Sequence, residues 1–215
     1  VTGLALGGDD AANYELASTE ASGEVGTITA REVVISVTGR GSKVYDGTTV
    51  LTYEQLGSLI FALAEGDAET LALLAADGVT LDASGVTGAF ADRNAGTAKG
   101  VTLTGYVLAG NELGNYVLSA DAVQGLADIA KKTLTLTAAT DSKIYDGTTA
   151  STGVVTIEGL VDGDSATATQ RFDTKNAGIR QLVVETWAIS DGNAGENYEV
   201  VTVDAAGEIE KRVLT

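Results

Sequence analysis

Short stretches in which apolar and polar residues alternate recur along the whole chain. Val101-Thr102-Leu103-Thr104 and Leu134-Thr135-Leu136-Thr137 alternate strictly, and residues 181–187 do so over a longer run. A period of two is typical of strands that bury one face. Asp-Gly and Asn-Ala-Gly sequences, which favour tight turns, separate these stretches. The pattern therefore predicts a mainly β fold built from many short strands.

One region has a different periodicity. Leu56, Leu59, Ile60 and Leu63 follow helical spacing, and Thr52 with Gln55 can form a capping box before them. We therefore expect one short amphipathic helix near residues 53–64, ended by Gly66. Beyond it, residues 71–75 and 79–81 flank Asp77-Gly78, which predicts a hairpin.

Three blocks of sequence occur more than once. Lys43-Val44-Tyr45-Asp46-Gly47-Thr48-Thr49 returns 100 residues later as Lys143-Ile144-Tyr145-Asp146-Gly147-Thr148-Thr149. The block Phe-Ala-Asp-Arg-Asn-Ala-Gly at 90–96 matches Phe-Asp-Thr-Lys-Asn-Ala-Gly at 172–178, and an Asn-Tyr pair occurs at 13–14, 115–116 and 197–198. The chain is therefore a tandem array, and each full repeat should hold six to eight strands in a β-sandwich-like or β-grasp-like module.

The order of these blocks divides the chain. Residues 1–30 correspond to the C-terminal part of a preceding repeat, 31–130 form a first full repeat and 131–210 a second, and 211–215 open another. The first repeat has an insertion near residues 53–89. No Gly/Ser-rich or Pro-rich linker lies between the repeats, so we expect modules stacked end to end with limited flexing. The chain begins without Met and has no visible signal peptide, which indicates an internal or processed segment.

Composition excludes several classes of function. The formal net charge is −17, which disfavours nucleic acid and anionic membranes as partners, and no apolar run approaches membrane-spanning length, so membrane insertion is not expected. His and Cys are absent, which removes the usual zinc sites and the Ser-His and Cys-His catalytic pairs. The recurring aspartates lie in turns rather than as an isolated pair for glycoside hydrolysis. The chain is not expected to be an enzyme.

The recurring Tyr, Asp, Asn and Gly residues have a structural interpretation and a functional one. Tyr would anchor the end of a strand, Asp and Asn would cap turns, and Gly would supply a positive φ angle; the Tyr of the Asn-Tyr pair would be buried with its hydroxyl bonded, as in a tyrosine corner. The alternative is an exposed Tyr-Asp site for a ligand. The residues concerned are Tyr45, Asp46, Gly47, Asn94, Gly96, Asn115, Tyr116, Tyr145, Asp146, Gly147, Asn176, Gly178, Asn197 and Tyr198.

This ordered set of motifs resembles the YDG repeat, which is similar to the MBG repeats of large bacterial surface proteins. The resemblance covers nearly the whole chain. It implies tandem modules in a filamentous-haemagglutinin-like adhesin exported by two-partner secretion, and a location that is secreted or on the cell surface, associated with the outer membrane. The second repeat departs from the family pattern at Ile179-Arg180-Gln181, and the insertion of the first is large. The resemblance names no ligand.

Two further kinds of chemistry are possible. Calcium could bind at acidic loops, although these match no EF-hand and are more simply interpreted as solvated acidic turns; no other cofactor is expected. The candidate ligands are Asp162, Asp164, Asp191, Asn193 and Glu196. Trp187 could stack on sugars but is expected in the core. A Lys–Asn crosslink would need a buried Lys43, and lysine is rarely buried.

These observations favour a structural function. We expect stalk or spacer repeats of a bacterial adhesin that serves cell adhesion or biofilm formation, whose partners are neighbouring repeats of the same chain. The alternative is that the repeats themselves bind polysaccharide or cell-surface glycans, with calcium as a possible requirement, and the unequal insertion favours this second hypothesis.

Overall fold

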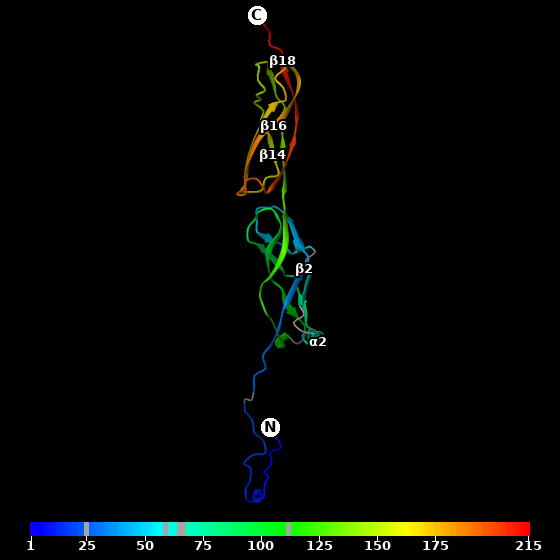
Figure 1. Cartoon of the computed structure of the whole chain (residues 1–215), viewed down its shortest axis with the longest axis vertical. Helices are drawn as coiled ribbons and strands as arrows, with labels where there is room; N and C mark the ends of the chain where they lie inside the picture. The colour runs from blue at the N-terminus through cyan, green and yellow to red at the C-terminus, as the bar shows by residue number, and fades with distance from the viewer. Residues whose placement is uncertain (24–25, 58–59, 64–67, 111–112) are drawn as a thin grey trace.

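The structure is a rod of two stacked modules, preceded in the chain by an extended N-terminal segment (Figure 1). It is a computed structural model, and it describes residues 1–23, 26–57, 60–63, 68–110 and 113–215. Strands predominate, so the predicted mainly β fold of tandem modules is confirmed. Within the described residues no helix is both long enough and apolar enough to cross a membrane.

The first repeat is built around a five-stranded sheet with the order β3-β11-β8-β7-β4, and three strand pairs complete it: β1 with β10, β2 with β5, and β6 with β9. Its strands are β1 (Arg31–Val33), β2 (Ile35–Thr38), β3 (Gly41–Val44), β4 (Val50–Leu51), β5 (Ile60–Leu63), β6 (Thr80–Asp82), β7 (Thr87–Phe90), β8 (Gly96–Thr104), β9 (Val107–Ala109), β10 (Tyr116–Leu118) and β11 (Val123–Ala130).

The second repeat has the same pairings in fewer, longer strands. Its strands are β12 (Lys132–Thr137), β13 (Ser142–Ile144), β14 (Thr156–Glu158), β15 (Ser165–Phe172), β16 (Gly178–Ser190), β17 (Tyr198–Val203) and β18 (Ala205–Glu210). They form the sheets β14-β12-β17 and β13-β18-β16-β15. In both repeats the first strand pairs in parallel with the strand that begins at the Tyr of the Asn-Tyr pair, Arg31 opposite Tyr116 and Lys132 opposite Tyr198. The repetition of sequence therefore corresponds to a repetition of topology.

The main hydrophobic core extends through both repeats. Leu51, Val101 and Leu103 of the first repeat belong to the same buried cluster as Leu134 and Leu136 of the second. β11 ends at Ala130 and β12 begins at Lys132, so one nearly continuous strand passes from the first module into the second (Figure 1). Two smaller clusters lie at the outer ends, one around Leu74 and Tyr116 and one around Phe172 and Leu182. The modules share their core and are not separate beads on a linker.

The insertion of the first repeat differs from the prediction. The capping box forms as expected, with the Thr52 backbone N–H bonded to the Gln55 side chain at 2.9 Å, but the helix α1 covers only Tyr53–Leu56. Residues Ile60–Leu63 are not helical; they form β5, paired with β2. Residues 58–59 and the expected helix stop at Gly66 lie outside the described residues. A short helix is only marginally stable in water. Residues 60–63 therefore gain more by forming hydrogen bonds to β2 than they would by lengthening α1.

The predicted hairpin near residue 77 is wrong, and a second helix, α2 (Ala68–Ala76), takes its place before β6. Ala, Leu and Glu are strong helix formers, and Asp77-Gly78 ends the helix instead of turning a hairpin. Gly78 has φ +67°, its N–H bonds to the Ala75 carbonyl at 3.3 Å, and the Val79 N–H bonds to the Leu74 carbonyl at 2.9 Å. This is a Schellman motif, in which Leu74 and Val79 are buried together. The described part of the first repeat thus contains two α-helices where one was expected.

Residues 1–23 contribute no buried side chain. They hold a 3₁₀ turn at Ala11–Asn13 and a single bridge between Thr2 and Glu20, and Tyr14 is exposed. In the full repeats the corresponding strand after Asn-Tyr pairs with the first strand of its own repeat. Residues 1–23 find no such strand in the described chain, which explains why they do not form a module.

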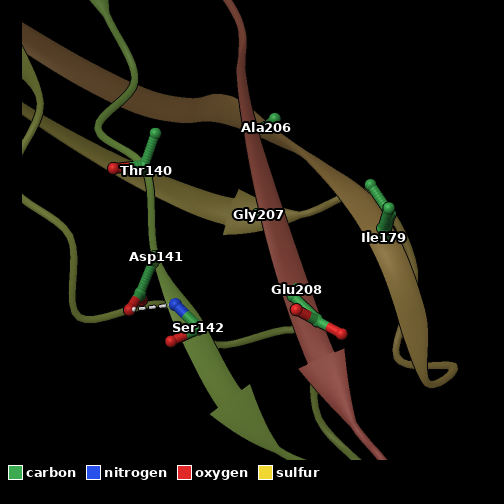
Figure 2. Close-up of a pocket in the computed structure, with 7 residues that line it drawn as sticks. All are labelled: Thr140, Asp141, Ser142, Ile179, Ala206, Gly207 and Glu208. Atoms are coloured by element: carbon green, nitrogen blue, oxygen red, sulfur yellow. Dashed lines mark hydrogen bonds between the residues drawn. The ribbon is translucent and has the colours of Figure 1, made fainter.

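At one close contact between neighbouring strands, the glycine lies on opposite strands in the two repeats. In the first repeat Gly41 on β3 leaves room for Ala127 on β11; in the second, Asp141 lies beside Gly207 on β18. Asp141 and Gly207 both line a hollow of about 500 Å³ (Figure 2). The Asp141 carboxylate faces the neighbouring loop, where it accepts hydrogen bonds from Ser151 Oγ at 2.6 Å and the Thr152 N–H at 2.8 Å. Asp141 is thus a turn-forming residue, and glycine opposite it is required by space.

Substituting Gly207 with alanine should destabilise the second repeat. A Cβ there would lie 2.6 Å from the Asp141 carbonyl oxygen and 2.7 Å from Leu182 Cδ1, too close for either contact. We expect Gly207→Ala to lower the free energy of unfolding by about 1–3 kcal/mol, the usual range for overpacking. Urea unfolding followed by circular dichroism measures it. Gly100→Ala on β8 is the control, because a Cβ there meets nothing within 4 Å; equal losses in both variants would contradict this explanation.

Candidate functional site at the junction of the repeats

The turn after β3 is built by the residues that recur in both repeats. The Asp46 carboxylate accepts hydrogen bonds from the Thr48 N–H at 2.9 Å and from Lys43 Nζ at 2.7 Å, and Gly47 has φ +78°. Asp146, Thr148 and Lys143 repeat the arrangement in the second repeat, where Gly147 has φ +81°. The Thr148 N–H, followed by Lys143, lowers the pKa of Asp146 to about 2. Asp and Gly therefore form the turn, as the structural interpretation predicted.

Lys43 is buried, contrary to expectation. Its side chain has no exposed surface, and besides Asp46 its ammonium donates to the Thr48 carbonyl, the Thr48 hydroxyl and the Val50 carbonyl at 2.8–2.9 Å. Four oxygen acceptors compensate the loss of water around the charge. The ammonium is therefore fully engaged in holding the turn together, and it contacts oxygens of Asp46, Thr48 and Val50 instead of an asparagine side chain.

Tyr45 lies where the two repeats meet. It is only 1% exposed, and its hydroxyl donates a 2.9 Å hydrogen bond to an Asp164 carboxylate oxygen of the second repeat. Its ring packs edge-on against Tyr198 with the ring centroids 5.5 Å apart, and the Arg93 guanidinium lies 5.9 Å from its centroid. The Tyr of the first repeated motif is thus a contact between repeats and not an exposed ligand site.

Asp164 is the centre of this junction. Its side chain is 1% exposed, and it accepts from Tyr198 at 2.6 Å, from Tyr45 at 2.9 Å and from Arg93 at 3.2 Å. Tyr45 and Arg93 come from the first repeat, and Tyr198 and Asp164 from the second. Burial, and then the hydrogen bond to Asp164, raises the pKa of Tyr198 to about 12; the same two causes raise the pKa of Tyr45. Both hydroxyls therefore stay protonated as donors across the physiological pH range.

Asparagine side chains form the second half of the junction. Asn197, fully buried, accepts from the Ala95 N–H of the first repeat at 2.8 Å and from Asn193 Nδ2 at 3.0 Å, and its own Nδ2 lies 3.5 Å from Asn94 Oδ1. The Arg93 guanidinium also donates to the Asp191 carbonyl at 2.8 Å. Backbone and side-chain donors of one repeat thus meet acceptors of the other with specific geometry.

Close packing accompanies these polar contacts. A Cβ on Gly47 would lie 2.8 Å from Val161 Cγ1 of the second repeat, whereas a Cβ on Gly147 would meet nothing within 4 Å. The first repeated glycine therefore serves both its turn and the junction, and the second serves the turn alone. The two glycines thus differ because a neighbouring repeat packs against Gly47 and none packs against Gly147 in the described chain.

The predicted calcium ligands do not gather into one site. The Asp191 carboxylate accepts from the N–H groups of Asn193, Gly195 and Asn197 at 2.8–3.2 Å, so hydrogen atoms occupy the positions that a cation would take. Asp164 is bonded to two hydroxyls and a guanidinium, Asp162 is exposed, and Glu196 pairs with Lys131 at 2.6 Å. Among the described residues, no three acidic side chains are grouped to hold a metal. These donor sets do not fit calcium, and calcium binding stays a prediction for titration to test.

The remaining predicted residues lie at the two outer ends of the repeats. Tyr145, Asn176 and Gly178 lie at the end of the second repeat away from the junction. Tyr116 lies at the opposite end of the first repeat, where its hydroxyl donates to Asp77 at 2.6 Å, just as Tyr198 donates to Asp164. Both Tyr residues of the full Asn-Tyr pairs are buried with bonded hydroxyls, but the acceptor is a carboxylate and not the backbone of a tyrosine corner.

Three details differ from the sequence analysis. Gly178 has φ +126°, but Gly96, its counterpart in the first repeat, does not have a positive φ; in that turn Ala98 has φ +52° instead. Trp187 is 47% exposed, so the expectation that it belongs to the core is wrong; it lies on β16, beyond the paired segment with β18. Arg93 and the role of Asp164 were missed, although Arg93 stands inside a recurring block and could have been found by asking why a cation recurs there.

Removing the Tyr45 hydroxyl should destabilise the junction. Tyr45→Phe leaves the ring in place but removes a donor to a buried carboxylate, so we expect the free energy of unfolding to fall by about 1.5–3 kcal/mol, the range for hydrogen bonds to charged groups. Urea unfolding followed by Trp187 fluorescence measures it.

The matched control is Tyr145→Phe. Among the described residues the Tyr145 hydroxyl makes no hydrogen bond, so its removal should change the free energy of unfolding by less than about 0.5 kcal/mol. If both variants lost the same stability, the hydroxyl of Tyr45 would have no special role between the repeats.

Comparison with known proteins finds one protein family twice along the chain. A protein-family model described as the YDG domain matches residues 29–123 and again residues 130–206. No curated protein and no solved structure matches the chain. The two matches cover most of the sequence and each includes one full Lys-x-Tyr-Asp-Gly-Thr-Thr motif, and the chain therefore belongs to the YDG domain family, of which it holds two copies.

Proposed function

We propose that this chain is a rigid stalk segment of a large bacterial surface adhesin, secreted or held at the cell surface, in which the repeats keep a binding region away from the cell. The observation that carries the proposal is the buried Asp164 carboxylate, bonded simultaneously by both repeats. A flexible linker would let the repeats rotate, and rotation would separate Asp164 from Tyr45 and Arg93, the two donors of the first repeat, which is costly for a buried charge. The junction therefore favours one relative orientation.

Three further features support the same function. The core is shared between the repeats, and β11 runs almost directly into β12, so bending would disturb both packing and strand pairing. The net charge of −17 favours solubility of an elongated particle. The family's resemblance to repeats of filamentous-haemagglutinin-like adhesins supports the cellular context. The proposal includes no catalytic activity.

Spin labels across the junction test its rigidity. The chain has no cysteine, so Leu126→Cys on β11 and Val201→Cys on β17 give two unique and exposed attachment points. Val201 pairs with Thr135, nine residues along the continuous strand from Leu126, so the two backbone positions lie about 30 Å apart at 3.3 Å per residue. Double electron–electron resonance should give one narrow distance distribution.

Arg93→Ala should broaden that distribution, because it removes donors to Asp164 and to the Asp191 carbonyl. Lys175→Ala changes the equivalent position of the second repeat, which lies away from the junction, and should leave the distribution unchanged. A broad distribution in the parent chain would rule out the rigid stalk.

A second function, glycan binding by the repeats themselves, is favoured by one observation. Trp187 is exposed and lines a hollow of about 450 Å³ together with Tyr198 and the Lys131–Glu196 ion pair. An exposed aromatic ring beside hydrogen-bonding groups is a suitable surface for sugar. The insertion is a weaker location for such a site, because Leu56 and Leu74 from it are buried and hold the first repeat together.

Titration with polysaccharides tests this second function. Trp187 is the single tryptophan, so its fluorescence reports directly on this hollow. If the hollow binds glycan, the Trp187 fluorescence should change saturably in the parent chain. Calorimetric titration, which needs no tryptophan, should show that Trp187→Ala abolishes binding and that Tyr53→Ala, an exposed aromatic in the insertion, does not. Each titration is repeated with calcium and with chelator. Loss of glycan binding in chelator would support calcium binding at the acidic loops. Binding that survives Trp187→Ala would exclude this site.

A further inference from the structure

The outer end of the second repeat presents residues equivalent in position to those that form the junction at the end of the first. Tyr145 corresponds to Tyr45, Asn176 to Asn94 and Lys175 to Arg93. We call the surface formed by Tyr145, Lys175, Asn176, Ala177 and Leu214 the end face. Part of it is a mainly apolar hollow of about 490 Å³, lined by Tyr145, Asn176, Ala177, Lys211, Arg212 and Leu214.

The residues of the end face are more exposed than their counterparts in the junction, although the two sets occupy equivalent positions in the sequence. Tyr45 is buried and Arg93 and Asn94 are partly buried, whereas Tyr145 is partly exposed and Lys175 and Asn176 are exposed. The strand that follows differs even more: Leu134 is 0% exposed in the shared core, and its counterpart Leu214 is 91% exposed. The end face thus has the composition of half a junction, with apolar surface that the other half would cover.

The chemistry of the end face specifies what would cover it. In the observed junction the Tyr45 hydroxyl and the Arg93 guanidinium converge on one carboxylate. The Tyr145 hydroxyl makes no hydrogen bond within the described chain, and Lys175 provides the cation in place of Arg93. A hydroxyl donor and a cation at these positions would bind a carboxylate on the facing loop.

Such a carboxylate is present on the opposite end of each repeat. In the second repeat Tyr198 holds Asp164 toward Tyr45 at 2.6 Å, and in the first repeat Tyr116 holds Asp77 at the same distance. The two ends of a repeat are therefore complementary to each other and not to themselves. Contacts of this head-to-tail kind continue in one direction and do not close into a dimer.

We infer that the end face is the docking surface for a further repeat of the same type, recognised by the acidic loop that carries the equivalent of Asp164. The inference rests on the proposed stalk function and deepens it by naming the partner and its carboxylate. Tyr145 and Lys175 bind that carboxylate, Asn176 faces the asparagine of the incoming Asn-Tyr pair, and Leu214 becomes part of a second shared core.

The test is a longer chain in which residues 131–210 are repeated directly after Glu210. Hydrogen exchange first establishes that the added copy folds, from protection of its strands. One spin label is placed at Ala206 of the original second repeat and the other at Val201 of the added copy. These two positions span the new junction, and they are equivalent to Leu126 and Val201 across the original one. We expect a distance distribution as narrow as that across the original junction.

Two substitutions of Lys175 show whether a carboxylate is recognised. Lys175→Glu brings like charges together and should abolish the narrow distribution, whereas Lys175→Arg, which copies Arg93, should retain it. Lys175 is exposed, so neither change should affect folding of its own repeat.

The outcomes separate the two proposals. A broad distribution at the new junction, beside a narrow one between Leu126 and Val201, overturns the docking inference alone; a broad distribution at both overturns the stalk as well. An added copy that stays unprotected, or a narrow distribution insensitive to Lys175→Glu, also overturns the inference.

Discussion

The junction depends on one buried carboxylate. Asp164 is almost completely removed from water, and an unpaired charge in that position would be strongly destabilising. It is tolerated because two tyrosine hydroxyls and one guanidinium bond to it, and these donors come from both repeats. The charge therefore couples the two modules. Neither repeat alone supplies all three donors to Asp164, and bringing them together requires one orientation of the repeats.

The same logic explains why polar and apolar contacts coexist here. The shared core gives affinity between the modules without specifying their rotation, because the hydrophobic effect is not directional. Hydrogen bonds are directional, and Asn197, fully buried between Ala95 and Asn193, accepts from both only in one arrangement. Apolar burial holds the repeats together and the polar groups define their register, which is the combination that a spacer of fixed length and direction needs.

Comparison of the two repeats shows how local context changes the role of one sequence motif. Gly47 and Gly147 have nearly the same φ angle, but only Gly47 packs against a neighbouring repeat. Lys43 is completely buried while Lys143 keeps some exposure. Tyr45 is a contact residue and Tyr145 belongs to an uncovered surface. Nearly the same motif is thus part of a complete junction in the first repeat and part of an uncovered surface in the second.

The repeats, their order, the turn chemistry of Asp46-Gly47 and the mainly β class all follow from the amino-acid sequence, because they depend on local periodicity and on residues whose backbone preferences are intrinsic. The sequence also indicated modules joined without a linker. It did not determine that residues 68–76 are helical, since Asp77-Gly78 is compatible with both a hairpin and a helix end, and burial of Leu74 with Val79 selects the helix. Nor could it pair Tyr45 with Asp164, 119 residues away. Only the stacking of one module on the next brings these residues together, and the cost of leaving that carboxylate unpaired decides how they stack.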